Sequence, residues 1–133
     1  MTTADNASLG RAFFDLLDRG DLEGALDLLA EDGVWTVQSG PAFSLAGDYT
    51  KQQFPEMLAK VGAAMPDGVR VEIATVTADE YRVVVEAVVH GTNVVGKTYD
   101  NKLVYVLDVR DGKIVHGREY LDTIHARDVL VVG

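Results

Sequence analysis

Residues 97–121 read KTYDNKLVYVLDVRDGKIVHGREYL, and this stretch decides the fold. Two runs rich in Val, Leu, Ile and Tyr, residues 97–109 and 113–121, flank the sequence Arg110-Asp111-Gly112. β-Branched and aromatic residues favour extended strands, and Asp-Gly is a strong signal for a tight turn between antiparallel strands. The stretch therefore predicts a β-hairpin near the end of the chain.

The same composition continues upstream of this hairpin. Residues 69–77 and 81–92 are again rich in Val, Ile, Thr and Tyr, and residues 78–80 and the pair Val95-Gly96 supply turns between the runs. Four such strands in succession predict an antiparallel meander that occupies the second half of the chain.

The first half has helical rather than strand-like periodicity. Apolar residues recur at spacings of three and four, which predicts helices over residues 7–19, 22–30 and about 50–65. A short strand over 34–38 separates the second and third helices, and Asp122-Thr123 begins a last helical turn that runs to Leu130. The predicted fold class is α+β, a cone-shaped, curved antiparallel sheet packed on three N-terminal helices.

Length and composition exclude several classes of protein. The 133 residues suit a single domain spanning 1–133, and 21 acidic against 12 basic residues give a net charge of −9, which disfavours nucleic acid as a partner. The chain has no cysteine, no apolar run of about 20 residues and no tight cluster of His, Asp and Glu. We expect a cytoplasmic protein without disulfides, membrane contact, metal or cofactor.

Two short motifs carry a resemblance to a known family. Asp111-Gly112-Lys113-Ile114-Val115 and Arg118-Glu119-Tyr120-Leu121-Asp122-Thr123 resemble the C-terminal part of SnoaL-like members of the nuclear transport factor 2-like superfamily. Gly20-Asp21 and Ala30-Glu31-Asp32-Gly33 fit the same pattern. The resemblance implies a cone-shaped fold with one pocket for a small hydrophobic molecule. The superfamily includes isomerases, cyclases, dehydratases, epoxide hydrolases and proteins without catalysis, so the fold alone assigns no activity.

The alternation of side chains along a strand decides which residues share the pocket. A tight turn centred on Asp111 would set Glu119 opposite Leu103, and a turn at Val95-Gly96 would set Val88 beside Leu103. One face then collects Glu86, Val88, His90, Asn101, Leu103, Tyr105, Glu119 and Leu121. The opposite, convex face collects Val83, Val85, Ala87, Val89, Val104 and Val106. We take the polar-bearing face as the concave one, because the resemblance places Glu119 inward.

The candidate catalytic residues follow from this face. Glu119 would be a carboxyl group among Val and Leu, and burial raises a carboxyl pKa toward the range useful for acid or base catalysis. Tyr105 would donate a hydrogen bond to a developing oxyanion, and His90 with Glu86 would tune or shuttle the proton. The predicted ligand-binding residues are Phe13, Leu17, Trp35, Val37, Val88, Asn101, Leu103 and Leu121. The alternative is that Glu119 faces solvent or a dimer partner and pairs with Arg118 or Arg82.

The resemblance also shows which activities are missing. A ketosteroid isomerase needs a base where Val37 stands and a donor where Phe13 stands. A limonene-type epoxide hydrolase needs an Asp-Arg-Asp set, and the matching places hold Val88, Glu86 and Glu119. Neither activity is expected here.

The sequence predicts a cofactor-independent acid–base enzyme of cyclase, isomerase or dehydratase type, acting on a small polyketide- or terpenoid-like molecule. The alternative is a non-catalytic module for ligand binding or dimerisation. We also expect a homodimer formed through the convex face with Val83, Val85, Val104 and Val106, because an apolar patch of that size is rarely left exposed.

Overall fold

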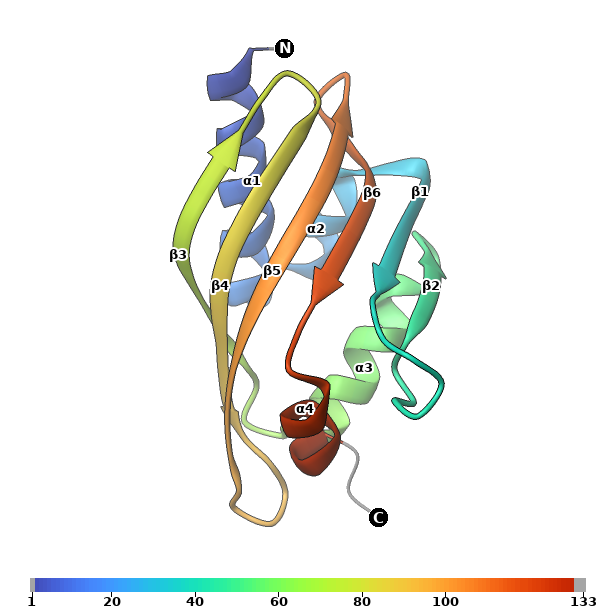
Figure 1. Ribbon diagram of the computed structural model, residues 1–133, viewed down its shortest axis with the longest axis vertical. Coiled ribbons are helices and arrows are strands. Elements are labelled where there is room, and N and C mark those ends of the chain that lie inside the picture. The colour runs from blue at the N-terminus through green and yellow to red at the C-terminus, as the bar shows by residue number, and fades with distance from the viewer. Residues whose placement is uncertain (1, 131–133) are drawn as a thin grey trace.

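The computed structural model describes residues 2–130, in which six strands form one curved sheet with α1 and α2 packed on one face (Figure 1). The helices are α1 (Thr3–Asp18), α2 (Leu22–Asp27), α3 (Phe54–Ala64) and α4 (Thr123–Leu130). The strands are β1 (Leu29–Val37), β2 (Gly47–Thr50), β3 (Arg70–Ala78), β4 (Arg82–Thr92), β5 (Thr98–Arg110) and β6 (Lys113–Tyr120). This confirms the predicted α+β class, with the helices of the first half packed against a curved sheet.

The ends of the first two helices follow from local chemistry. Thr2 and Asp5 form a reciprocal capping box, so α1 starts four residues before the predicted position. Gly20 follows the end of α1, and its φ of 75° lies in the left-handed region that glycine adopts without strain. The Asp21 carboxylate then accepts a hydrogen bond from the Gly24 N–H at 2.9 Å and caps α2, as the sequence indicates.

The strand order is β2-β1-β6-β5-β4-β3, and every neighbouring pair is antiparallel except β1 and β6, which are parallel. Three assignments differ from the predictions: the start of β1, the presence of β2 and the start of α3. β1 begins at Leu29, so the end of the predicted second helix is already strand, and β2 occupies the end of the predicted loop. Helix α3 begins only at Phe54, because Thr50 and Gln53 form their reciprocal hydrogen bonds in a turn before it.

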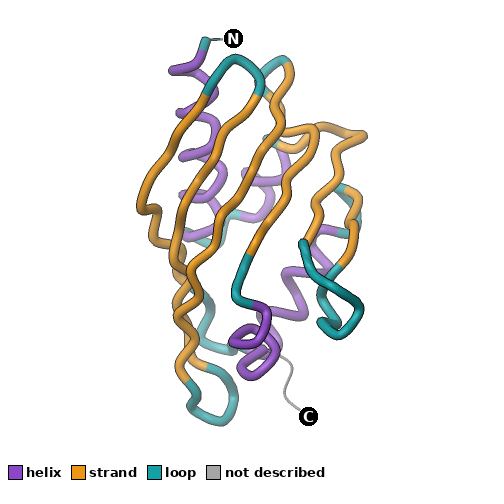
Figure 2. The backbone as a smooth tube through the Cα atoms, in the orientation of Figure 1, coloured by secondary structure: helices purple, strands orange, loops and turns teal. Residues whose placement is uncertain are grey.

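Strands β5 and β6 form a hairpin (Figure 2), and its register preserves the predicted face of Glu119. Asp111 and Gly112 both have positive φ and form a two-residue turn, which moves the register by one residue. An irregularity between Asp108 and Val109 moves it by one more. Glu119 therefore pairs with Tyr105 instead of Leu103, and because two residues is one full strand period, it still shares a face with both.

The hairpin between β4 and β5 contradicts the predicted register. Asn93 pairs with Lys97 across a three-residue loop that ends on Gly96 at a φ of 84°, whereas the sequence predicts a two-residue turn. The register shifts by one residue, so Ala87 and not Val88 lies opposite Leu103. A shift of one residue turns every side chain of the strand to the other face.

The β4 side chains expected on the convex face instead form part of the core. Val83 and Val85 are fully buried, and both lie against Gly10 of α1. Of the four valines expected in the dimer interface, Val104 and Val106 do lie on the outer face, where Val104 is 36% exposed and pairs with the half-exposed Tyr120. The face toward the helices is thus apolar along β4, and it carries the few inward polar groups on β5 and β6.

Candidate functional site

A cavity of about 520 Å³ lies between the sheet and the helices α1, α2 and α3. Aromatic and aliphatic side chains dominate its wall, including Phe14, Trp35, Phe43, Phe54 and Met57. Its size and lining suit one small hydrophobic molecule, since ligand cavities are usually apolar with a small number of placed polar groups. The inward polar groups are Glu119, Tyr105 and Tyr99.

Glu119 is the one carboxyl group set among the apolar walls. It lies on β6, between Val37 of β1 and Tyr105 of β5. The Trp35 indole Nε1 donates a hydrogen bond to the Glu119 Oε1 at 2.7 Å. Its side chain keeps some accessible surface, and that surface belongs to the cavity wall.

The surroundings of Glu119 decide its protonation. Burial raises the pKa of its carboxyl group from the ordinary 4.5 to about 7, and the hydrogen bond from Trp35 only partly opposes that shift. Near neutral pH the protonated and the ionised forms of Glu119 are therefore both populated, so the group can donate or accept a proton.

Gly117 explains why Trp35 reaches Glu119. Trp35 and Gly117 are partners in the parallel pairing of β1 and β6, and the Trp35 indole ring lies directly over the Gly117 Cα. A side chain at position 117 would occupy the place of the ring. A glycine inside a strand often marks such a close approach.

Tyr105 presents a hydroxyl group to the same cavity. Its ring is held against Phe14 with a centroid distance of 4.3 Å, and against Trp35 at 6.0 Å. No hydrogen bond within residues 2–130 involves its hydroxyl, and no polar side-chain atom in that range is both enclosed and unpaired, so the hydroxyl opens on the cavity. Burial, and then the charge of Glu119, raise the pKa of Tyr105 well above its usual value. The hydroxyl remains a donor at neutral pH.

An ion pair closes one part of the cavity mouth. Arg70 Nε and Nη2 donate to the two carboxylate oxygens of Asp18 at 2.8 and 3.0 Å, and the Val71 N–H donates to the same carboxylate at 2.7 Å. The hydrogen bond from Arg70 is the main cause that lowers the pKa of Asp18. Asp18 is thus ionised and paired, whereas Glu119 is a buried carboxyl group whose pKa lies near neutral pH.

The structure brings together most of the predicted site residues. The cavity wall contains Leu17, Trp35, Val37, Leu103, Tyr105, Glu119 and Leu121. Phe13 lies one layer deeper, with its ring stacked on Trp35 at 5.5 Å. Asn101 is buried beside the cavity and makes its hydrogen bonds to Tyr99 and Asp122.

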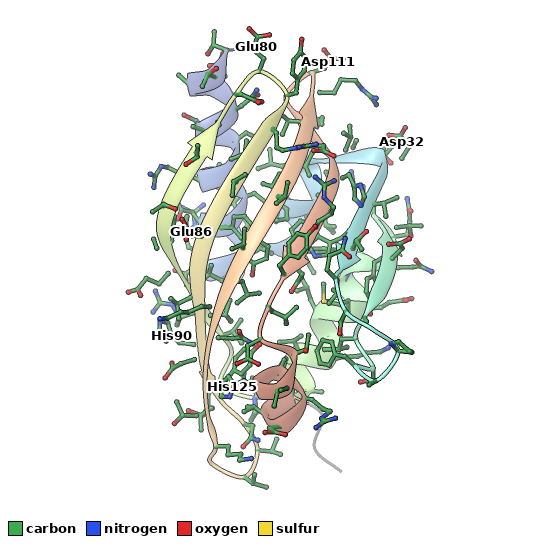
Figure 3. The ribbon with its side chains drawn as sticks, viewed as in Figure 1. Asp32, Glu80, Glu86, His90, Asp111 and His125 are labelled. Carbon is green, nitrogen blue, oxygen red and sulfur yellow. The ribbon has the colours of Figure 1, made fainter. Side chains whose placement is uncertain are left out.

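Three predicted site residues lie outside the cavity, because the register of β4 and β5 is shifted by one. Glu86, Val88 and His90 are on the outer face of the sheet, and Figure 3 labels Glu86 and His90 there. The Glu86 carboxylate accepts a hydrogen bond from Thr75 at 2.7 Å, and His90 Nδ1 lies 2.6 Å from the Asp100 carboxylate. The contact with Asp100 is the main cause that raises the pKa of His90. These groups cannot tune Glu119 directly.

Sequence reasoning misses part of the wall. Phe43 and Leu45 come from the segment predicted as a loop, and Phe54 and Met57 come from α3. The one available signal is the presence of apolar residues within a loop otherwise rich in Ser, Gly and Pro. The predicted set also omits Tyr99, although its parity on β5 matches that of Leu103 and Tyr105.

Two kinds of feature are absent from residues 2–130. No group of three or more His, Cys, Asp or Glu side chains there is arranged to hold a metal ion. No helix in the same range is long and apolar enough to cross a membrane.

Comparison with known proteins agrees with this geometry. A family model for the SnoaL-like domain matches residues 10–117. No curated protein matches the sequence significantly. The fold is similar to a nuclear transport factor 2-like protein of unknown function from Burkholderia pseudomallei, with a TM-score of 0.86 and 23% identity over 96% of this chain and 98% of that one.

Two other solved structures share the fold. One is a candidate polyketide cyclase from Xanthomonas campestris pv. campestris, with a TM-score of 0.77 and 25% identity over 96% of this chain and 98% of that one. The other is TerC co-crystallised with polyporic acid, with a TM-score of 0.85 and 24% identity over 96% and 99%. The fold is thus that of nuclear transport factor 2-like proteins, and with a family match over most of its length the chain belongs to the SnoaL-like domain family.

Proposed function

We propose that the protein is a cofactor-independent acid–base enzyme acting on a small hydrophobic molecule. The observation that carries this proposal is Glu119, a carboxyl group in an apolar cavity with a pKa of about 7. Its only hydrogen bond within residues 2–130 comes from Trp35 to one oxygen, so the second oxygen is free to meet a ligand. A surface carboxylate would be fully ionised at neutral pH and strongly hydrated, and it would be a weak base.

The chemistry follows from two neighbouring groups. Glu119 removes a proton from an activated carbon or hydroxyl of the substrate, and it returns that proton at a second position or to a leaving hydroxyl. Tyr105, its cross-strand neighbour on β5, donates a hydrogen bond to the oxygen on which negative charge develops. One positioned acid or base supplies about 10²–10⁴-fold in rate, so the substrate must be activated already, as a polyketide or an enone is.

The substrate class is proposed from the cavity and supported by the relatives. The aromatic wall and the volume of about 520 Å³ favour a polyketide- or terpenoid-like molecule. A similar protein is a candidate polyketide cyclase, and TerC shares the fold and has been crystallised with polyporic acid. Cyclisation, isomerisation and dehydration all need the proton transfer that Glu119 offers.

The proposal is tested without knowledge of the substrate by using 5-nitrobenzisoxazole. A carboxylate base removes its ring C–H proton while the N–O bond breaks, and the product is a coloured cyanonitrophenolate. We expect the wild-type protein to accelerate this reaction, with a rate that rises with pH through about 7 as Glu119 ionises. Glu119→Gln should lower the rate roughly 100-fold.

Glu86→Gln is the matched control for this assay, because Glu86 lies on the outer face of the sheet. Its rate should equal that of the wild type. A wild-type rate no greater than that of Glu119→Gln at pH 8 would show that Glu119 is not a base in this cavity.

A non-catalytic binding module is the second candidate. The observation in its favour is that His90 and Glu86 are not in the cavity, which leaves Glu119 with tyrosine hydroxyls and an indole as its polar neighbours. Such a protein would bind hydrophobic molecules and give no proton transfer to Glu119 in the assay above.

We also propose a homodimer, formed through the outer face of the sheet. Val104 and Tyr120 are 36% and 45% exposed there, and together with Val88 they border a hollow of about 410 Å³.

In a symmetric dimer each substitution enters the interface twice. Val104→Lys should therefore produce a monomer in analytical ultracentrifugation, while Val94→Lys, at a 56% exposed position in the β4–β5 loop, should not. A wild-type monomer at tens of micromolar would contradict the proposal.

A further inference from the structure

Asn101 is a buried amide that joins β5 to the start of α4. Its Nδ2 lies 2.9 Å from the Tyr99 hydroxyl and 3.0 Å from the Asp122 carbonyl oxygen. Its Oδ1 accepts a hydrogen bond from the Asp122 N–H at 3.1 Å. The side chain is 1% exposed, and these three contacts use both of its protons and its oxygen.

The backbone of Asp122 settles the direction of each bond. A backbone N–H only donates and a carbonyl oxygen only accepts, so the amide cannot be turned around. Its nitrogen must therefore face Tyr99, and an amide nitrogen only donates. The Tyr99 oxygen is consequently the acceptor, and its own proton has no acceptor in any hydrogen bond within residues 2–130.

The Tyr99 side chain is held at the cavity wall. Its ring is 3% exposed and stacks on His125 of α4, with a centroid distance of 5.2 Å and an interplanar angle of 9°. Burial is the main cause that raises the pKa of Tyr99 well above its usual value, and the charge of Glu119 adds to it. The hydroxyl thus stays protonated and lies within electrostatic range of Glu119.

We propose that Tyr99 donates a hydrogen bond to the ligand at a second polar atom, apart from the atom that meets Glu119 and Tyr105. Asn101 is then a positioning residue that acts through Tyr99 and not a ligand contact. This inference rests on the proposed function of the cavity and narrows its ligand class. The molecule is mainly apolar and carries two separated hydrogen-bond acceptors, such as two ring carbonyl or phenolate oxygens.

The experiment compares two soluble probes that differ in such acceptors. Anthraquinone-2-sulfonate and anthracene-2-sulfonate have the same three-ring outline, and only the first has two ring carbonyl groups. Both are titrated by calorimetry, and Trp35, the only tryptophan of the chain, reports by its fluorescence whether the probe enters the cavity. Tyr99→Phe should weaken the binding of anthraquinone-2-sulfonate about tenfold and leave the binding of anthracene-2-sulfonate unchanged. Tyr81→Phe, at a 73% exposed position, is the matched control and should change neither.

Asn101→Asp separates a ligand contact from a purely structural bond. One oxygen of the new acid still accepts from the Asp122 N–H, and the oxygen that replaces Nδ2 keeps a proton for the Asp122 carbonyl oxygen. That second oxygen would also accept the Tyr99 proton and so withdraw this donor from the ligand. The preference for the quinone should then fall as it does in Tyr99→Phe, although Tyr99 is present.

The outcomes separate the inference from the function on which it rests. If Tyr99→Phe weakens the binding of both probes equally, or of neither, the proposed role of Tyr99 is wrong. The role of Glu119 is then still decided by the 5-nitrobenzisoxazole assay. A wild-type protein that binds neither probe would overturn both the second contact and the proposed hydrophobic ligand.

Discussion

Replacing Glu119 by Gln is expected to stabilise the folded protein by about 3 kcal/mol at pH 8, and to change its stability little at pH 4. The reason is the carboxyl pKa, which is about 7 in the folded state against an ordinary value of 4.5. Folding therefore disfavours the ionised form by roughly 2.5 pK units, and each unit corresponds to about 1.4 kcal/mol. Glutamine keeps the shape and has no charge to desolvate.

The sign of the pH dependence follows from the two pKa values. Below pH 4.5 the carboxyl group is neutral in both the folded and the unfolded state, so its burial costs the wild type no folding stability through desolvation of a charge. Between pH 4.5 and 7 the unfolded chain ionises while the folded chain holds its proton, and the wild type loses stability steadily. Above pH 7 both states are ionised, and the full desolvation cost remains. The Glu119→Gln variant would keep an acceptor for the Trp35 N–H over the whole range, because the amide oxygen replaces Oε1.

Urea unfolding of wild type and Glu119→Gln at several pH values from 4 to 8 measures this difference. Glu31→Gln is the control, since the Glu31 side chain is 86% exposed and its pair with Lys51 contributes little. A difference that stays near zero at every pH would mean that Glu119 is hydrated in the folded state. A large, pH-independent loss of stability would mean instead that it is ionised and paired.

Glu119 and Tyr105 could be assigned to one face of the sheet because two register errors of one residue each add up to one full strand period. The resemblance to SnoaL-like proteins then indicates that this face is the inward one. The turn at Asp111-Gly112 has one residue more than a turn centred on Asp111 implies, and the irregularity near Asp108 adds another. A shift of two residues preserves the face of a strand. The Asp-Gly turn and the alternation of apolar residues therefore sufficed to bring Glu119 and Tyr105 together.

The position of β4 could not be predicted in this way. The predicted register rests on the loop length, and it places Glu86 and His90 on the face of Glu119. The alternation along β4 is the signal that favours the opposite face, because its polar residues share one parity and its buried residues share the other. Three loop residues with Gly96 in the left-handed region replace the two that Val95-Gly96 suggested. The wall formed by Phe43 and α3 depends on long-range packing of a loop, which local periodicity does not encode.

Gly117→Ala is expected to destabilise the protein by about 3 kcal/mol and to disturb the site at the same time. A Cβ atom at position 117 would lie closer than 3.0 Å to Trp35 Cε3, and real Cβ atoms essentially never come that near. Trp35 is 3% exposed and packs against Phe13 and Phe54, so its ring can move only toward the cavity, where it loses these contacts and its hydrogen bond to Glu119. Forced overpacking of a well-filled core usually costs about 1–3 kcal/mol, and a rigid indole lies at the upper end.

The same substitution should change the chemistry of Glu119 in a stated direction. Displacing the indole breaks the hydrogen bond from Nε1 to Oε1, which is the contact that lowers the pKa of Glu119. The pH at which the 5-nitrobenzisoxazole rate reaches half its maximum should therefore rise above about 7 in Gly117→Ala. Gly40→Ala is the matched control, because Gly40 is exposed, lies outside the cavity wall, and has no atom within 4 Å of its Cβ position and no positive φ. Wild-type stability together with an unshifted rate profile in Gly117→Ala would show that the Trp35 indole does not lie over β6, and that the pKa of Glu119 is set without it.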